Sequence, residues 1–591
     1  MNQSSSTGLL LGSAVLTSLF LACGSTDTPG PAAGGSSSTG GSVGAGATGG
    51  TGTGGAQPST GGTGTGGTST GGTGTGGTGG SVQNTGGSSA SGGHGAGGGA
   101  GMIGTGGSIS GAGRPGTGGT TGGTAGAPPA TGGGAGTGSA GTSGSAGAGM
   151  MGNCNFTVMQ QTADKAGSGG IPTVGVVNWS VDLTGLKTAS IDFTLQGASS
   201  KQTAPVDVAT GPNFRTLLLG MKSSKTYSFK INASDGTKTC TSQDYMITTG
   251  ALPTALPRIT RTAGAAAASQ AKGFIVTSSG LGAGGGFGGG GSTSTSYAFI
   301  LDADGEIVWF APAPATCSRA KMSYDGQYMW MVELNVDNMS KDGGELRRVS
   351  MDGLTSSGSI PGMKNCHHDL TILPDGRAAC MSWVQQSGDQ PSDLLESDEK
   401  GNVKKIVTVD SKIYVGGSGL GGGSGTFHAN SIHYHQKDDS YTIGDRNPNL
   451  FVKVDHTGKL LWQFGGSCTN APAGQNCVGG TWKVNHGHDM MDDGTFLLFN
   501  NGQSGASTAF FYQLTETGTF AATMKGSYSP GTTSSVLGDV QRLPNGNTLV
   551  TFSTASVIHE IDKSNAVVQQ ISGPGGYAEW RETLYGAPPR F

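Results

Sequence analysis

The chain has 591 residues and a formal net charge of −4, and only 12% of its residues are charged. This balance gives no sign of nucleic-acid affinity, so no nucleic-acid partner is expected. Nearly half of the 115 glycines lie before residue 152, which separates a long glycine-rich segment from the folded remainder.

An apolar run from Leu9 to Ala22 opens the chain and is followed by Cys23. This run is short for a membrane span and fits an export signal over residues 1–23. Its ending, "LFLAC", resembles a bacterial lipobox, which predicts a lipid on Cys23 and attachment to the outer membrane or cell surface. No Lys or Arg precedes the run, and Phe20 replaces the usual aliphatic residue. A plain cleaved signal with a periplasmic or secreted product is therefore the alternative.

Residues 24–152 consist mainly of Gly, Thr, Ser and Ala in GTGG-like repeats with almost no charge. Such a segment cannot bury enough apolar surface to offset the entropy lost on ordering. We expect a disordered stalk with a root-mean-square reach of roughly 60 Å, taking about 5–6 Å times the square root of its length.

Residues 153–250 contain short alternating stretches typical of strands, among them "NFTVMQQ", "SIDFTLQG", "FRTLLLG", "TYSFKINASDG" and "DYMITTG". An apolar residue, Met221, stands six positions before Tyr227, which opens a strand. This arrangement resembles the tyrosine corner of immunoglobulin-like and fibronectin type III sandwiches. The segment is therefore predicted to be a small β-sandwich, followed by the proline-marked linker "ALPTALPRIT".

Residues 255–591 repeat a unit of strand, tight turn and strand. The six copies span 297–311, 345–360, 393–409, 449–465, 509–525 and 556–572. Their turn residues, 48, 48, 57, 60 and 47 positions apart, are Gly305, Gly353, Gly401, Gly458, Gly518 and Asn565. A second hairpin lies between successive copies, so each period of about fifty residues holds four strands. This pattern predicts an all-β, six-bladed β-propeller, closed by "AKGFIVTSSG" near residue 275 and the C-terminal segment.

Export makes the cysteines beyond Cys23 candidates for disulfides. Cys468 and Cys477 enclose the short polar loop "CTNAPAGQNC" and are expected to pair. Cys154 and Cys240 are expected to join strands of the first domain. One of three further cysteines is left over, and the sequence does not decide among Cys317, Cys366 and Cys380.

Histidine occurs at the same end of equivalent strands in three of the second hairpins. These are His367 and His368 in "HHDLTILPDG", His428 in "FHANSIHYH", and His486 and His488 in "HGHDMMDDG". The rotational symmetry of a propeller brings equivalent strand ends to one mouth of the central channel. Arg446 ends the strand after His428 and belongs to the same side. We therefore expect a converging polar site that includes both His486 and His488.

The motifs "AFILDADGEIVWFA", "HHDLTILPDG", "HANSIHYHQKDDSYTIGDRNPNLFVKVDHTGKLLWQFGG", "GHDMMDDGTFLLFNNG" and "YAEWRETLYG" resemble those of bacterial aryl sulfotransferases. The resemblance covers about residues 255–591. It implies an exported six-bladed propeller that takes sulfuryl groups from an aryl sulfate rather than from phosphoadenylyl sulfate and passes them to a phenolic acceptor. No cofactor is implied, and the oligomeric state is not indicated.

The resemblance also implies roles for single residues. His488 matches the histidine that attacks sulfur and is transiently sulfated, in a ping-pong reaction. His428, Arg446 and either His367 or His368 match the groups that hold the sulfuryl oxygens. A short disulfide loop before the nucleophile fits Cys468 and Cys477. "TF" before His428 and Asn447 after Arg446 depart from the usual residues and leave the substrate preference open.

Two other interpretations compete with this one. The histidines could hold zinc or copper, but Arg446 at the same mouth suits an anion and would repel a dication. A propeller displayed on a stalk could also bind a ligand or partner without catalysing a reaction. The histidines outside the converging set are expected at outward or turn positions; they are His433, His435, His456 and His559.

Overall fold

The computed structural model describes residues 154–280, 295–334, 344–384, 391–410, 412–414, 427–469, 471, 473–502 and 505–588, and the backbone of 147–151. All belong to the second of two compact units, residues 130–591. Their regular secondary structure is almost entirely strand, with one short α-helix, α1 (Ala163–Ala166), and a few 3-10 turns. None of the helices in this part of the chain is long and apolar enough to cross a membrane. The predicted signal, the lipid on Cys23 and most of the predicted stalk lie outside the described residues.

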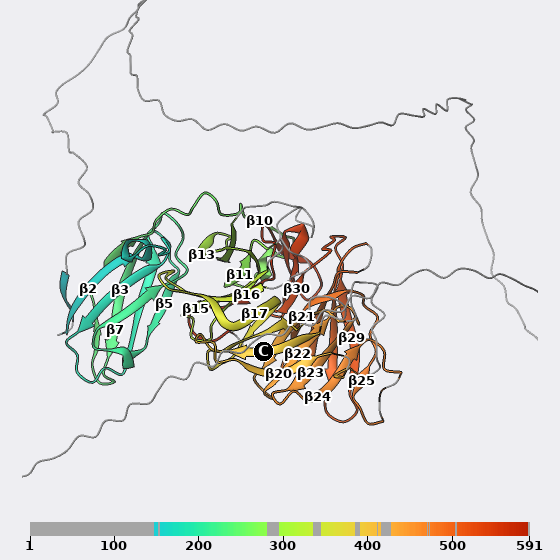
Figure 1. The fold of residues 1–591 in the computed structure, drawn as a ribbon. Coiled ribbons are helices and arrows are strands. Elements are labelled where there is room, and N and C mark those ends of the chain that lie inside the picture. The colour runs from blue at the N-terminus through green and yellow to red at the C-terminus, as the bar shows by residue number, and fades with distance from the viewer. Residues whose placement is uncertain are drawn as a thin grey trace, which may run out of the picture. The chain divides into compact units, whose positions relative to one another are not determined.

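Two antiparallel sheets form the first β region (Figure 1). One has the order β1 (Gly147–Met151), β2 (Cys154–Thr162), β3 (Gly175–Val181) and β6 (Phe214–Leu218). The other has the order β5 (Lys201–Val206), β4 (Thr188–Leu195), β7 (Thr226–Ser234) and β8 (Thr239–Thr241), with β9 (Tyr245–Thr248) also paired to β7. The strands alternate buried and accessible residues, most regularly in β7, because one side of each sheet faces a shared core. The sequence had predicted five of these strands and missed β1, β3, β5 and β8. Strand β1 (Gly147–Met151) lies within residues 24–152, which were predicted to be a disordered stalk.

Two local features of this region match the sequence predictions. A disulfide joins Cys154 at the start of β2 to Cys240 in β8, and so links the two sheets. The hydroxyl oxygen of Tyr227 accepts a hydrogen bond from the backbone N–H of Lys222 at 2.8 Å. That contact is the one by which a tyrosine corner fixes the chain entering a strand.

Most of the remaining strands pair with their neighbours in the chain as antiparallel hairpins. Their bounds are β10 (Thr260–Ala263), β11 (Phe274–Ser278), β12 (Ser296–Leu301), β13 (Ile307–Ala313), β14 (Thr316–Met322), β15 (Tyr328–Leu334), β16 (Gly344–Ser350), β17 (Ser356–Ile372), β18 (Ala378–Trp383), β19 (Ser392–Ser397), β20 (Lys404–Val409), β21 (Ala429–His435), β22 (Ser440–Asp445), β23 (Leu450–Asp455), β24 (Leu460–Gly465), β25 (Cys477–Val478), β26 (Asn485–Met490), β27 (Thr495–Asn500), β28 (Thr508–Thr515), β29 (Ala521–Tyr528), β30 (Asp539–Arg542), β31 (Thr548–Phe552), β32 (Val557–Ile561), β33 (Val567–Ser572) and β34 (Glu579–Arg581). All six predicted hairpins are present. Their turn residues all have positive φ, which glycine and asparagine adopt most readily.

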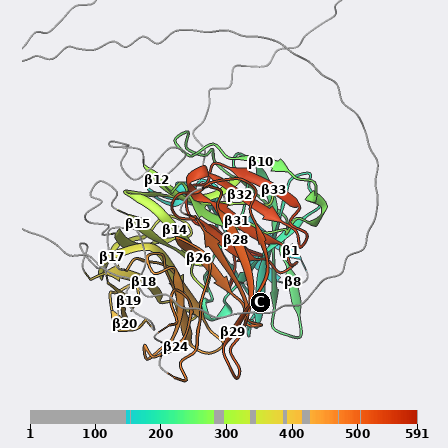
Figure 2. The same ribbon diagram turned by 90° about the vertical axis from the view of Figure 1, so that its right-hand side faces the viewer.

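These hairpins build sheets that follow one another in chain order around a centre (Figure 2). Five sheets present six innermost strands, because the seven-stranded sheet from β14 to β20 contributes two. The six strands are β34, β14, the second half of β17, β21, β26 and β30. Polar contacts join each to the next: Tyr577 N to Ser318 O, Ser318 Oγ to His368 O, Ile432 N to Asp369 Oδ2, Asn430 Nδ2 to Asn485 O, Arg542 N to Asp489 Oδ2, and Trp580 N to Gln541 Oε1. The circle is closed by β34, which pairs with β11, as the sequence predicted. The fold is thus all-β and β-propeller-like.

Three disulfides are present in the described residues. Cys468 and Cys477 are joined, as predicted, and Cys477 lies in β25, which pairs in parallel with β24. The sequence did not decide the pairing of three further cysteines. The structure joins two of them, Cys366 and Cys380, across β17 and β18. Cys317 is the buried free cysteine.

Candidate functional site

Four histidines from the inner strands β17 and β26 and from the residue directly before β21 lie close together. They are His367, His368, His428 and His486, and each is at most 8% exposed. The ring of His368 is central, because its centroid lies 4.9 Å from that of His428 and 6.0 Å from that of His486. The structure therefore brings together histidines from three sheets, as the equivalent strand positions predicted.

His367 and His368 are adjacent in the sequence, yet both rings lie in this cluster. In a regular strand they would point to opposite faces. His368 instead has φ of +60°, and the pairing of β17 with β18 shifts register between His367 and Leu370. His368 is consequently the member of the pair that contacts both His428 and His486, whereas His367 stacks on Trp383 at 4.0 Å.

A chain of polar contacts joins three of the imidazoles. His367 Nε2 lies 3.2 Å from Ser392 Oγ, and its Nδ1 lies 2.9 Å from His368 Nδ1. His368 Nε2 lies 3.3 Å from His428 Nε2. A neutral imidazole carries one N–H, so each such contact has one donor nitrogen and one acceptor nitrogen. The tautomers of the three histidines are thereby coupled.

His486 is held differently, by the carboxamide of Asn501. Its Nδ1 lies 2.5 Å from Asn501 Oδ1, and its Nε2 is buried without a hydrogen-bond partner among the described residues. A buried polar atom without a partner is costly and is often found at a site that acts on a ligand. The ring of His368 is a neighbouring imidazole, with its centroid 6.0 Å from that of His486.

A break in the strand pattern separates His486 from His488. The register of β26 against β27 shifts between Asn485 and His488, and the N–H of Gly487 leaves the ladder to bond Gly538 O at 2.9 Å. A Cβ on residue 487 would lie 2.2 Å from an oxygen of Asp539, so only glycine fits there. This irregularity directs His486 to the cluster and His488 away from it.

His488 was predicted to share the converging site, and this expectation was wrong. Its Nδ1 is 2.9 Å from Ser431 Oγ, and its Nε2 is 2.7 Å from Thr442 Oγ1. The ring packs against Phe451 and Phe496. Both nitrogens of His488 are thus occupied between neighbouring sheets, and its contacts in the described chain include none of the four clustered histidines.

Arg446 is the cation of the cluster and follows β22 directly. Its backbone N–H bonds His428 O at 3.2 Å. Before it, fully buried Asp445 accepts hydrogen bonds from the backbone of His428 at 2.8 Å and from the Tyr414 hydroxyl at 2.6 Å. Burial raises the pKa of Asp445 to about 6, although these hydrogen bonds oppose the rise. Asp445 therefore fixes the start of β21 next to the arginine.

Burial and positive charge keep the clustered histidines neutral. Burial, then the charge of Arg446, lowers the pKa of His368 to about 3. The pKa values of His428 and His486 are lowered well below 6.5 by burial, His368 and Arg446. Burial and His368 likewise lower the pKa of His367. Neutral imidazoles near an arginine favour an anionic ligand over a cation.

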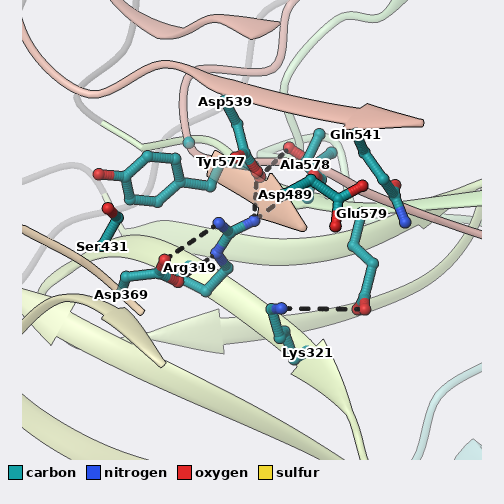
Figure 3. Close-up of polar contacts among 12 residues, drawn as sticks. Arg319, Lys321, Asp369, Ser431, Asp489, Asp539, Gln541, Tyr577, Ala578 and Glu579 are labelled. Atoms are coloured by element: carbon teal, nitrogen blue, oxygen red, sulfur yellow. Dashed lines mark hydrogen bonds and ion pairs between the residues drawn. The ribbon is translucent and has the colours of Figure 1, made fainter. Parts of the chain in front are cut away.

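The centre of the ring is filled by a second arginine, which is paired with acids (Figure 3). Arg319 donates to both oxygens of Asp369, at 2.6 and 3.3 Å, and to Asp539 at 2.5 Å, and it lies over the ring of Tyr577. Beyond it, a cavity of about 240 Å³ is lined by Lys321, His433, His435, Asp489, Gln541, Glu579 and further residues. None of the four clustered histidines borders that cavity. The histidine cluster and this cavity are therefore separate polar regions, and the histidine cluster is the one that lies in the field of Arg446.

The remaining histidines correct part of the sequence prediction. His435 and His559 were expected at outward positions, but each is 6% exposed, and they bond Thr442 and Tyr528, respectively. His433 is partly accessible, and His456 lies in the turn after β23. No group of three or more His, Cys, Asp or Glu within the described ranges has the arrangement to hold a metal ion.

Sequence reasoning missed Asn501, Trp383 and Asp445. Asn501 lies in "FNNG", a stretch that the resemblance singled out without giving it a role. Asp445 directly precedes Arg446. An acid next to a predicted ligand-binding cation was a signal by which the sequence could have identified it as a site residue. Nothing in the sequence connects Trp383 with His367, because the contact depends on the pairing of β17 with β18.

Comparison with known proteins agrees with this reading. The family model described as arylsulfotransferase (ASST) matches residues 262–576. The match spans more than half of the chain, which therefore belongs to the arylsulfotransferase family. Membership supports an aryl sulfotransferase activity in general. No curated protein matches the chain.

Several solved structures are similar at low identity. A protein of unknown function from Bacteroides thetaiotaomicron is 12% identical over 69% of this chain and 94% of its own, with a TM-score of 0.30. A putative 6-phosphogluconolactonase from Bacteroides fragilis is 12% identical over 53% and 98%, with a TM-score of 0.33. The Cps50 (Swd1) β-propeller domain from Myceliophteria thermophila is 7% identical over 49% and 90%, with a TM-score of 0.31.

Proposed function

We propose that this protein transfers a sulfuryl group from an aryl sulfate to a phenolic acceptor through a sulfohistidine on His486. The observation that carries the proposal is the unpartnered Nε2 of buried His486, beside His368 and within the field of Arg446. In this proposal the ring of sheets is a six-bladed propeller, in which the long β17 serves two blades. The first β region is an immunoglobulin-like sandwich.

His486 has the chemistry that a nucleophile needs. Burial and neighbouring positive charge lower the pKa of His486, so that its imidazole is neutral at pH 7. In the first half-reaction, Nε2 gives its lone pair to sulfur, and the bond between sulfur and the aryl oxygen breaks. The electron pair leaves with the aryloxide. In the second half-reaction, the acceptor phenol oxygen attacks sulfur, and the pair of the N–S bond returns to Nε2.

Arg446 stabilises the sulfuryl oxygens in this mechanism. The transferred group has a loose transition state whose negative charge is spread over its peripheral oxygens, as in phosphoryl transfer. A guanidinium offers a fixed fork of donors to such oxygens. The donor's own negative charge also opposes the effect of Arg446 on the neighbouring imidazoles and raises their affinity for protons.

The coupled histidines supply the proton that the leaving aryloxide needs. The Nε2 atoms of His428 and His368 are in contact, and the Nδ1 atom of His368 is in contact with the Nδ1 atom of His367. A proton given to the aryloxide by one of these rings is replaced along the chain. The same ring later takes the proton of the acceptor phenol, as microscopic reversibility requires.

Release of nitrophenolate from 4-nitrophenyl sulfate, with and without added phenol, tests the function. A transferase gives a burst equal to the enzyme concentration without acceptor and continuous turnover with phenol. Peptide mapping of the burst intermediate should place one acid-labile sulfuryl group on the peptide that contains "NHGHDMM". A label on His488 would overturn the assignment to His486. A folded protein that releases no nitrophenolate from several aryl sulfates would instead support the non-enzymatic, ligand-binding propeller.

A further inference from the structure

We infer that Asn501 is a positioning residue that locks His486 in the Nδ1–H tautomer and leaves the lone pair on Nε2. The inference rests on the proposed function for its kinetic consequence, but the tautomer itself does not depend on catalysis. It assigns to Asn501 a role that follows from its own hydrogen bonds.

The orientation of the Asn501 carboxamide is determined by three contacts. Its Nδ2 donates to Ser534 O and to Leu537 O, both at 2.7 Å. Exchanging the oxygen and nitrogen of the amide would place Oδ1 against these two carbonyl oxygens and lose both bonds. The Oδ1 atom therefore points at His486, and because it can only accept, His486 Nδ1 must carry the proton.

The backbone around Asn501 is built to hold this arrangement. Asn501 is 2% exposed, and its N–H bonds Val484 O at 3.0 Å, two residues before His486. Leu537 has φ of +55°, an unusual conformation for a leucine, and its carbonyl is one of the two acceptors of Asn501. Gly538 O in turn binds the N–H of Gly487. One segment thus fixes both the carboxamide and the peptide next to His486.

The lock has two chemical consequences. A neutral imidazole with its proton on Nδ1 presents a lone pair only at Nε2, which is the atom that has no hydrogen-bond partner among the described residues. Once Nε2 carries a sulfuryl group, the ring becomes cationic, and the Nδ1–H donor to Asn501 Oδ1 strengthens. Asn501 therefore favours both the reactive tautomer and the covalent intermediate.

The test compares Asn501→Leu and Asn501→Asp in the full chain with Asn500→Leu as the matched control. Asn500 is the preceding asparagine, and its Oδ1 accepts from the backbone of Lys483 rather than from a histidine. In ¹⁵N-histidine spectra, the resonances of His486, identified by their loss in His486→Gln, should show Nδ1–H in the parent protein. Asn501→Leu should give a mixture of tautomers, and Asn500→Leu should show no change.

The kinetic arm measures the nitrophenolate burst with 4-nitrophenyl sulfate across pH. Asn501→Leu should slow the burst by roughly 10²-fold, as expected when a catalytic imidazole loses its orienting partner, with KM for the donor within about threefold. Asn501→Asp keeps an acceptor and adds negative charge, which raises the pKa of His486. The burst rate of this variant should recover partly at alkaline pH. The acid limb of its pH profile should lie at higher pH than that of the parent protein.

The outcomes separate this inference from the proposed function. If the parent forms no burst, the sulfuryl-transfer proposal fails, while the NMR comparison still tests the lock. If the parent labels His486 but Asn501→Leu labels it equally fast, or keeps a single Nδ1–H tautomer, the inference about Asn501 is overturned. A merely structural role would lower the melting temperature of both leucine variants without moving the tautomer or the pH profile.

Discussion

His486 and His488 are separated by one glycine, and they occupy opposite kinds of environment. His488 has both ring nitrogens bonded to hydroxyls and its ring packed on phenylalanines, so it belongs to the packing between two sheets. His486 has one nitrogen bonded to a fixed amide and the other without a partner. Both are buried, and both have lowered pKa values. Burial therefore does not distinguish the two histidines, whereas the nitrogen without a partner and the nearby charge of Arg446 do.

Replacing each histidine by alanine is the sharpest way to break this comparison. His486→Ala should abolish the sulfuryl label and lower turnover by roughly 10⁴-fold or more, because the nucleophile is gone. His488→Ala should keep the label and most of the turnover but lose about 1–3 kcal/mol of stability, since two buried hydroxyls lose their partner. Burst kinetics and denaturant unfolding of both variants measure these effects. The reverse pattern would return the nucleophile to His488.

Arg446 tests whether the cluster acts on an anion. Arg446→Ala should slow sulfation of His486 by roughly 10²–10³-fold through lost charge stabilisation, and Lys should restore only part of the rate. Arg446 also lowers the pKa values of His368, His428 and His486, so the alanine variant should shift the acid limb of the burst rate to higher pH. An unchanged rate and pH profile would separate Arg446 from the chemistry.

His368 and His488 should also make the free energy of unfolding depend on pH. Burial lowers the pKa of both His368 and His488 to about 3. Each binds a proton in the unfolded chain below about pH 6.5 but stays neutral in the folded protein down to about pH 3. Their contribution to stability is therefore full above pH 6.5 and is lost as the pH falls through this window. His488→Gln should flatten the slope by up to about 1.4 kcal/mol per pH unit, measured by urea unfolding at several pH values.

The smallest effect on the labelling of His486 is expected for the disulfide of the short loop. Cys468→Ser with Cys477→Ser removes a cross-link over a short segment, which should cost roughly 2–3 kcal/mol on chain-entropy grounds. The strand β25 should then detach from β24, while His486 and its bond to Asn501 are untouched. Labelling of His486 should accordingly persist at reduced melting temperature. Loss of labelling in a folded double variant would tie the loop to the site.

Much of the ring and part of the site could be predicted from the sequence. The hairpins have a clear period and turn residues that require positive φ, and equivalent strand ends placed His368, His428 and His486 together. The regular two-residue alternation of a strand, however, assigned His488 to the same face as His486. That inference failed because Gly487 leaves the ladder to bond Gly538, which follows β29 in the next hairpin connection. Such a contact between distant segments has no local signal. The same reason hid Asn501, whose orientation depends on Ser534 and Leu537.

The closure of the ring by β34 also governs when the site can exist. The hydroxyl of Thr277, in β11, donates a hydrogen bond to the backbone oxygen of Tyr577, 300 positions later in the chain. The histidines lie between these two positions, on inner strands that are held in a circle only after this contact forms. Long-range contacts of this kind form late and slowly in folding. A growing chain therefore carries these histidines as separate, unassembled pieces, and the histidine cluster forms only once residues near 580 have been made and have docked.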